Sequence, residues 1–458
     1  MTLLTTIAAF LMTLGILVVI HEYGHYWVAK KSGVKVLRFS IGFGRPLARW
    51  VRGPDRTEWV LAALPLGGYV RMLDERDPEC LPIAPADLPR AFNRQSVYKR
   101  IAIVLAGPVA NLLLAVAVYW FLSVVGVFEP AAVVGTPPQA SAAAKAGLLA
   151  GDTVIDVAGN PVRSWNELRW LLLQRAVATD PIELEVEGSD KRRRALTIQA
   201  DPVSSEDLDG DLVGRLGFVL FSGPTRIGQV TEGSPAFHSG LQTGDRIVSV
   251  NGEPLGSASR LRALIRESAE RRIDFGVERD AAESKLARIP LQITPARITE
   301  GGKTFGRIGA ELSDRLPPIK VQYGPLESIP RAVQKTVDTA VFSLKMLGKM
   351  LTGEASWKNL SGPVTIADYA GQTARIGLAA FLGFLALVSI SLAVLNLLPI
   401  PMLDGGHLLY YLIEIIKGSP PADWVVEWGQ RAGVALLGLL TVLALYNDLL
   451  RLLPDFFE

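Results

Sequence analysis

Four stretches of this 458-residue chain carry no charged side chain, and they set narrow limits on the folds that it can adopt. Residues 1–20, 101–128 and 376–403 lack Asp, Glu, Lys and Arg, and a shorter uncharged stretch covers 432–447. A helix needs about 20 consecutive apolar residues to cross the hydrocarbon core of a bilayer. The pattern therefore predicts a polytopic α-helical membrane protein with four transmembrane helices, of which the fourth is marginal in length.

The overall composition agrees with a membrane protein. The mean hydropathy of +0.28 is unusual for a soluble enzyme, and the net charge of +2 provides no basic field for nucleic acid. The single cysteine, Cys80, excludes an internal disulfide and a cysteine-rich zinc finger. We expect the first stretch to be retained rather than removed as a signal peptide, because no basic residue precedes it and no small-residue cleavage site follows it.

Basic residues predict the orientation of the helices. Between Val28 and Arg100 the chain holds 14 Lys and Arg against 7 Asp and Glu. Because basic loops stay on the cytoplasmic side, we expect this segment to be cytoplasmic, and both termini and the 129–325 region to be periplasmic. Within the segment, residues 58–72 combine β-prone residues with paired glycines. They predict a short hairpin inside a membrane-associated β element of about residues 35–75.

The polar middle of the chain contains an internal repeat. The pattern Gly-Leu-x-x-Gly-Asp begins at Gly147 and again at Gly240, 93 residues later, and each copy is followed by an alternating, strand-like stretch. The repeat predicts two tandem α+β modules, at 129–203 and 220–297. Their pattern resembles the core of PDZ domains, which bind peptides as an added strand. The alternative is that the modules only filter substrates by size.

A connector of residues 325–370 follows the modules. Within it, apolar residues recur every three or four positions between Ser328 and Leu351, with lysines on the remaining positions. This spacing predicts an amphipathic helix. The helix would lie either on the membrane surface or against the second module.

A short polar motif follows the first uncharged stretch. His21-Glu22-Tyr23-Gly24-His25 places two imidazoles four residues apart on one helix face, where both can bind one zinc ion. Glu22 lies beside them, where it can take a proton from water. Polar side chains at the end of an apolar helix are costly without a compensating partner. The alternative, a helix that merely emerges among lipid headgroups, requires no metal.

A catalytic zinc site usually has a third protein ligand, and two residues near the end of the third uncharged stretch are candidates. Asp404 closes that stretch, and a buried carboxylate there is costly unless it is paired or bound to metal. His407 lies about one helical turn further on. Asp404 is the favoured ligand, and His407 would then orient Asp404 or the substrate.

Taken together, these motifs resemble the site-2 protease family of intramembrane zinc metalloproteases, in particular its bacterial RseP-like branch. The matching elements are the His21–His25 motif, Gly67-Gly68-Tyr69-Val70, Ala106-Gly107-Pro108-x-Ala110-Asn111, the Asn396–His407 segment and the two PDZ-like modules. The resemblance implies one Zn²⁺ bound by His21, His25 and Asp404, with Glu22 as general acid and base. It also implies substrate contacts by Asn396 and Pro399 and by the re-entrant β element that contains Gly67, Gly68 and Tyr69.

The function implied is intramembrane endopeptidase activity of a multi-pass protein of the bacterial inner membrane, whose catalytic residues lie in the membrane regions 1–128 and 376–458. Substrates would be single-span membrane proteins, such as an anti-sigma factor already trimmed on the periplasmic side and remnant signal peptides. Partners would include membrane lipid and peptide ligands of the modules, but no nucleic acid. Two other classes remain: a non-catalytic scaffold built on the modules, and a metal transporter. A scaffold needs no general base, and transporters usually repeat their membrane halves, which this chain does not.

Overall fold

The computed structural model describes residues 2–178, 181–188, 190–199, 212–255, 258–281, 285–300, 303–315, 318–357 and 360–452. These residues fall into two compact units, which are described separately. The first unit combines the N-terminal part of the chain, up to Val127, with the C-terminal part from Gln322. The second unit contains the intervening residues, from Phe128 to Val321.

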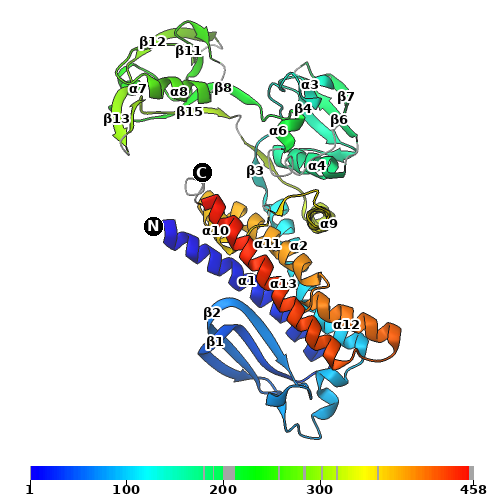
Figure 1. Ribbon diagram of the computed structural model, residues 1–458. Coiled ribbons are helices and arrows are strands. Elements are labelled where there is room, and N and C mark those ends of the chain that lie inside the picture. Colours follow the sequence, from blue (N-terminus) through cyan, green and yellow to red (C-terminus); the bar gives the residue numbers. More distant parts are fainter. Residues whose placement is uncertain are drawn as a thin grey trace. The chain divides into compact units, whose positions relative to one another are not determined.

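Among the described residues, four helices are long and apolar enough to cross a membrane. They are α1 (Thr2–Lys31), α2 (Val97–Val125), α11 (Leu378–Leu397) and α13 (Asp423–Leu452) (Figure 1). The helix α1 continues beyond residue 20 to Lys31, so that His21 and His25 lie inside the helix rather than at its end. The helix α13 begins at Asp423, before the short uncharged stretch, and this extension gives the fourth span its full length.

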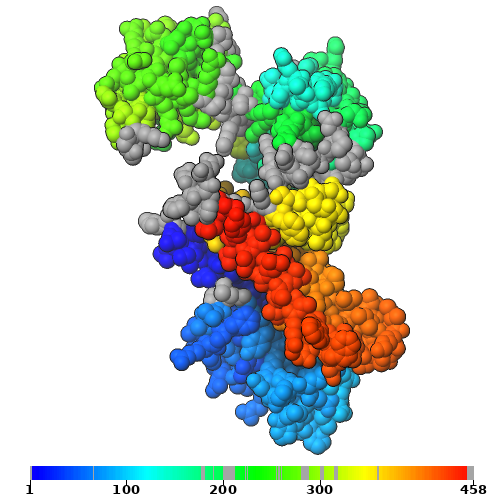
Figure 2. All heavy atoms as spheres, viewed as in Figure 1, coloured from blue at the N-terminus to red at the C-terminus, as the bar shows by residue number. Residues whose placement is uncertain are grey.

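Small residues let α1 and α11 approach α2 closely. A methyl group at Gly24 of α1 would lie 2.3 Å from the carbonyl oxygen of Ala106 in α2, so only glycine fits there. On α11, the Ser389 hydroxyl donates to the carbonyl oxygen of Asn111, at 2.7 Å. Small side chains and interhelical hydrogen bonds of this kind are how membrane helices associate. Figure 2 shows α13, in red, extending over one face of this helical unit.

A folded β-sheet follows α1. It is built from β1 (Val36–Arg52) and β2 (Thr57–Met72), which pair antiparallel with several register shifts. Ser40 pairs with both Val60 and Tyr69, so the first half of β1 lies between the two halves of β2. The predicted short hairpin within 58–72 is therefore wrong: the two halves of that segment do not pair with each other. Residues 68–72 form one edge of the sheet, and residues 46–52 form the other.

Three further helices complete the first unit: α9 (Pro325–Thr352), α10 (Pro363–Ile376) and α12 (Asp404–Lys417). The helix α9 packs on α2 through a face that includes Ala332, and it leaves Val333 and Val337 exposed. The start of α10 is held by Asp448 of α13, whose carboxylate accepts from the backbone N–H groups of Gly362, Val364 and Thr365.

The second unit contains two modules with the same plan. The first has a sheet in the order β5-β4-β6-β7, and the second has the order β12-β11-β9-β8-β15 with β10 beside β9. The elements of the first are β3 (Val127–Glu129), α3 (Ala142–Lys145), β4 (Thr153–Val157), β5 (Asn160–Pro161), α4 (Trp165–Ala178), β6 (Ile182–Glu187), β7 (Arg193–Ile198) and α6 (Leu212–Leu216). Those of the second are β8 (Ser222–Val230), α7 (Pro235–His238), β9 (Arg246–Val250), β10 (Glu253–Pro254), α8 (Ala258–Glu267), β11 (Ile273–Ala281), β12 (Lys285–Ile293), β13 (Ala296–Glu300), β14 (Lys303–Arg307) and β15 (Ala310–Arg315). The strand β16 (Ile319–Val321) then pairs with β3.

A second repeated segment closes each module. Gly214-Arg215-Leu216-Gly217 recurs as Gly306-Arg307-Ile308-Gly309, 92 residues later. Gly217 and Gly309 both have positive φ angles, of +98° and +73°. The chain after the first copy returns to the first module, because Val219 accepts a backbone hydrogen bond from Gly135. After the second copy, β15 joins β8. Each module therefore ends after this segment, beyond the limits of 203 and 297 expected from the first repeat alone.

Candidate functional site

Two imidazoles meet on the inward face of α1. His21 and His25 are both buried, and their Nε2 atoms lie 3.2 Å apart. The helix α2 passes directly over them at Gly107, where a methyl group would lie 2.2 Å from His25 Nε2. Glycine at this position therefore leaves room for the two rings to point at a common site between α1 and α2.

Asp404, at the start of α12, brings a carboxylate to the same point. Its Oδ2 atom lies 3.2 Å from His21 Nε2 and 3.6 Å from His25 Nε2. Of the residues that the structure describes, these three form a group whose candidate ligand atoms all lie within 4.8 Å of one another.

The spacing of these three atoms fits a zinc ion. In a tetrahedral site with zinc–ligand distances of 2.0–2.1 Å, two ligand atoms are about 3.3 Å apart. The separations of 3.2, 3.2 and 3.6 Å are close to one face of such a tetrahedron. The Asp404 Oδ2 atom is also buried without a hydrogen-bond partner, which is costly unless a cation compensates it. The residues present therefore fit the metal, and they leave a fourth position open.

Two contacts from α2 orient the imidazoles. His25 Nδ1 lies 2.8 Å from the carbonyl oxygen of Ile103, so Nδ1 carries the proton and Nε2 is free to bind metal. His21 Nδ1 lies 3.3 Å from the side-chain amide of Asn111, whose Oδ1 atom has no partner. Rotating that amide by half a turn would let Oδ1 accept the His21 Nδ1 proton, because amide nitrogen and oxygen positions are assigned from such networks. Asn111 would then fix the metal-binding tautomer of His21.

Glu22 lies beside the imidazoles and against the edge of the β-sheet. A methyl group at Gly68 would lie 2.9 Å from Glu22 Cγ and 2.7 Å from the carbonyl oxygen of Ser40. The edge segment 68–72 can therefore pass Glu22 at this distance only because residue 68 has no side chain. Of the other expected substrate contacts on this edge, the Tyr69 hydroxyl accepts from Arg38, at 3.2 Å.

The loop between α11 and α12 delivers Asp404 to the site. It contains Pro399 and Pro401, and Met402 adopts a left-handed conformation with a φ of +84°. A side chain at Gly405 would lie 2.1 Å from the carbonyl oxygen of Leu398, so the loop packs directly on the first turn of α12. Asn396 is half-buried at the end of α11 and Pro399 is exposed in the loop; neither belongs to the three-residue group.

His407 does not belong to the three-residue group. It lies one turn beyond Asp404 on α12 and is exposed, whereas His21 and His25 are buried. Its ring makes an edge contact with Tyr410, with a centroid separation of 6.5 Å. The fourth histidine, His238, is exposed in α7 of the second unit.

A buried ion pair that sequence reasoning missed holds α12 against α2. Arg100 Nη2 donates to Glu414 Oε1 at 2.6 Å, and the two side chains are only 8% and 17% exposed. The guanidinium also lies over the ring of Tyr411, 4.9 Å from its centroid. Glu414 lies on the helix α12, which begins at Asp404. The pair with Arg100 therefore helps to hold this helix, and with it the Asp404 carboxylate, in position. The only sequence signal was the position of Arg100, directly before an uncharged stretch.

We predict that Arg100→Ala destabilises the protein by about 3–5 kcal/mol, because it leaves Glu414 buried without a partner. Loss of the anchor should also weaken zinc retention. Thermal unfolding in detergent and metal analysis measure the two effects. The double variant Arg100→Met, Glu414→Met removes both charges and should recover most of the lost stability. Unchanged stability in the single variant would show that the pair contributes nothing.

The fold and this site define a class of protein: membrane proteins with a candidate metal centre at their apolar helices. The comparisons agree. A model of peptidase family M50 matches residues 9–440. A protein of Ralstonia nicotianae named as a zinc metalloprotease is 45% identical over 457 residues, which cover 98% of each chain. The regulator of sigma-E protease of Escherichia coli is 40% identical over 463 residues, covering 99% of this chain and 100% of the relative. The chain belongs to peptidase family M50 and is a zinc metalloprotease of the membrane.

Proposed function

We propose that this protein is an intramembrane endopeptidase that hydrolyses peptide bonds within the transmembrane segments of single-span membrane proteins. One observation carries the proposal. Glu22 and the two imidazoles lie within a helix of membrane-spanning length and composition, and Asp404 reaches them from the end of another apolar segment. Such costly polar groups in a membrane are expected to serve a function.

The residues divide the chemistry between them. We propose His21, His25 and Asp404 as the ligands of one zinc ion. When bound, zinc lowers the pKa of water to about 7 and polarises the scissile carbonyl group. Glu22 takes the proton from the attacking water and then delivers it to the leaving amine. Ile103 and Asn111 keep the imidazoles in the required tautomers.

We propose that the sheet edge at residues 68–72 holds the substrate. A helical substrate must unwind before hydrolysis, because its carbonyl groups are engaged in hydrogen bonds. An exposed strand edge can hold the unwound segment by adding it as a further strand, and Gly67, Gly68 and Tyr69 lie at or next to the edge that passes Glu22. Asn396, at the end of α11, and Pro399, on the loop that leads to Asp404, would also contact the substrate.

Proline at the substrate edge tests this arrangement. We expect Tyr69→Pro to lower cleavage on the order of 10–100-fold, because a small displacement of a bound substrate is enough for such a loss, while zinc content stays normal. The matched control is Val51→Pro in the opposite edge, where Val51 is 52% exposed. Tyr69→Phe controls for loss of the hydroxyl. Equal cleavage by the two proline variants would refute substrate binding along residues 68–72.

The name of the Escherichia coli relative refers to regulation of sigma-E. We propose that the substrates here include an anti-sigma factor already trimmed on the periplasmic side, within an envelope stress response, and remnant signal peptides. The excess of basic residues between Val28 and Arg100 supports a cytoplasmic site in the inner membrane. The two modules would then be periplasmic and PDZ-like, and they would admit only shortened substrates.

A reconstitution assay tests the proposed function. The purified protein in detergent should contain one zinc per chain and cleave a model single-span substrate within its apolar segment. A chelator should abolish cleavage, and added zinc should restore it. A scaffold would bind substrate without cutting it, and a transporter would move metal across vesicles without proteolysis. Absence of cleavage by the zinc-loaded protein would overturn the proposal.

A further inference from the structure

The helix α13 carries two glycines on one face, within its first three turns. Gly429 and Gly433 lie four residues apart, so both face the same side of the helix. A methyl group at Gly433 would lie 2.8 Å from the carbonyl carbon of Pro401 and closer still to its oxygen. A methyl group at Gly429 would overlap the hydroxyl oxygen of Tyr410 on α12. Glycines at this spacing let a membrane helix approach its neighbour closely, and here the neighbour includes the loop that leads to Asp404.

The first turn of α12 contacts the same proline. A methyl group at Gly406 would lie 2.7 Å from Pro401 Cα, so glycines of two different helices pack on this one residue. Pro401 lies three positions before Asp404 in the chain. A side chain added at Gly433 must therefore displace the Pro401 backbone, and with it the residues that carry the Asp404 carboxylate to the imidazoles.

The backbone between Pro401 and Asp404 is strained. Met402 has a φ of +84°, and a residue other than glycine keeps such a conformation only where the surrounding structure holds it. A hydrogen bond from the Leu403 N–H to the carbonyl oxygen of Ile400, at 3.1 Å, closes this turn from within. The contact with α13 supplies a restraint from outside the turn.

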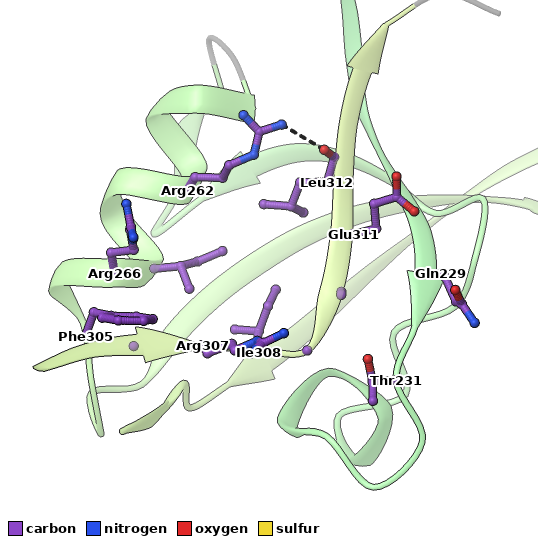
Figure 3. A pocket seen from close by; sticks show the side chains of 13 residues that line it. Gln229, Thr231, Arg262, Arg266, Phe305, Arg307, Ile308, Glu311 and Leu312 are labelled. Carbon is purple, nitrogen blue, oxygen red and sulfur yellow. Dashed lines mark hydrogen bonds between the residues drawn. The ribbon is translucent and has the colours of Figure 1, made fainter. Parts of the chain in front are cut away.

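A similar glycine contact in the second module restrains its segment less. A methyl group at Gly306 would overlap the carbonyl oxygen of Ile265 on α8, and Figure 3 shows the flanking Phe305 and Arg307 below that helix. A groove of about 570 Å³ remains open beside this segment. Pro401 differs because backbone of both α12 and α13 lies against it.

We propose that Gly429 and Gly433 are positioning residues of the metal centre. By letting α13 lie against Pro401 and Tyr410, they hold the loop in the conformation that brings the Asp404 carboxylate to the two imidazoles. The inference rests on the proposed role of Asp404 as a zinc ligand. Alanine at either glycine should then disturb metal binding, although alanine is the better helix former.

The first test measures zinc affinity of the full chain in detergent, by competition with a chromogenic chelator. Gly433→Ala should lower the affinity by about 10–100-fold, the usual loss when a residue that orients a ligand is changed. The matched control is Gly438→Ala, the same change on the same helix at a position where no atom of another described segment lies within 4 Å. It should bind zinc as tightly as the unmodified chain. Equal affinities of the two variants would overturn the proposal.

The contact at Gly429 allows a rescue experiment. Gly429→Ala should weaken zinc binding, and adding Tyr410→Phe should restore it, because the atoms then nearest to the methyl group are Tyr410 Cζ at 3.4 Å and Pro401 Cγ at 3.6 Å. Within the described part of the chain, the Tyr410 hydroxyl is buried without a hydrogen-bond partner. Tyr410→Phe alone should therefore leave the affinity unchanged. A double variant that binds zinc no better than Gly429→Ala would contradict positioning through this contact.

A cobalt spectrum separates positioning from a loss of stability. The visible absorption of bound Co²⁺ depends on the arrangement of its ligands. At saturating cobalt, Gly433→Ala should change this spectrum and Gly438→Ala should not; an unchanged spectrum in Gly433→Ala would overturn the proposal. Asp404→Asn, measured alongside, tests the ligand role itself. Full zinc affinity in that variant would refute the ligand role, whereas its loss there without any effect of Gly433→Ala would refute only the positioning by α13.

Discussion

Glu22→Gln is expected to lower hydrolysis of a transmembrane substrate by at least about 100-fold, since a positioned general acid and base typically contributes 10²–10⁴-fold. Glutamine keeps the size of the side chain and its contact with Gly68, but it cannot accept a proton. The candidate zinc ligands are His21, His25 and Asp404, so the metal content should stay at the level of the unmodified protein. Substrate cleavage and metal analysis on the same preparation measure both quantities.

The matched control for this variant is Glu427→Gln. Glu427 is 63% exposed on α13 and pairs with Arg431, so its loss should affect neither cleavage nor zinc. If Glu22→Gln kept its activity, the proton would have to be taken by another group. If it lost zinc, Glu22 would be a ligand, and the division of roles at the site would have to be redrawn.

The membrane part of the fold could be predicted because it rests on local composition. A stretch without charge of sufficient length has few alternatives in a bilayer, and all four stretches belong to membrane-length helices. The pairing of β1 with β2 could not be read in the same way. Residues 58–72 look like one hairpin, but Ser40 pairs with both halves of that segment. The partner strand, β1, lies outside residues 58–72, so the pattern within that segment does not reveal the pairing.

The site likewise combines residues that the sequence predicts with contacts that it does not. His21 and His25 lie four residues apart on one helix, so the sequence alone places them on one face. Asp404 was conspicuous because it follows directly after an uncharged stretch. The contacts that position these residues join distant segments. Arg100 and Glu414 are separated by 314 positions, and the Ile103 contact uses a backbone carbonyl that no side-chain motif encodes. The closing segment of each module was missed because it repeats only a few residues, far from the first repeat.

Asp404→Asn is expected to weaken zinc binding by more than about 100-fold. Removal of a residue that merely orients a ligand typically costs 10–100-fold in metal affinity, and loss of a charged ligand should exceed that. Asparagine also removes the negative charge that compensates the cation beside two neutral imidazoles. Competition with a chromogenic chelator measures the affinity directly, without reference to proteolysis.

His407→Ala is the decisive companion variant, because Asp404 and His407 are the rival third ligands. Asp404 Oδ2 lies within 3.6 Å of both imidazole Nε2 atoms, whereas His407 is exposed and outside that group. We therefore expect His407→Ala to retain zinc and Asp404→Asn to lose it. The opposite pattern would require α12 to shift along its axis by about 4.5 Å, because residues three positions apart lie on the same helix face, one turn from each other. The Arg100–Glu414 pair and the packing of Gly405 on Leu398 oppose that shift, so it should occur only together with loss of the anchor.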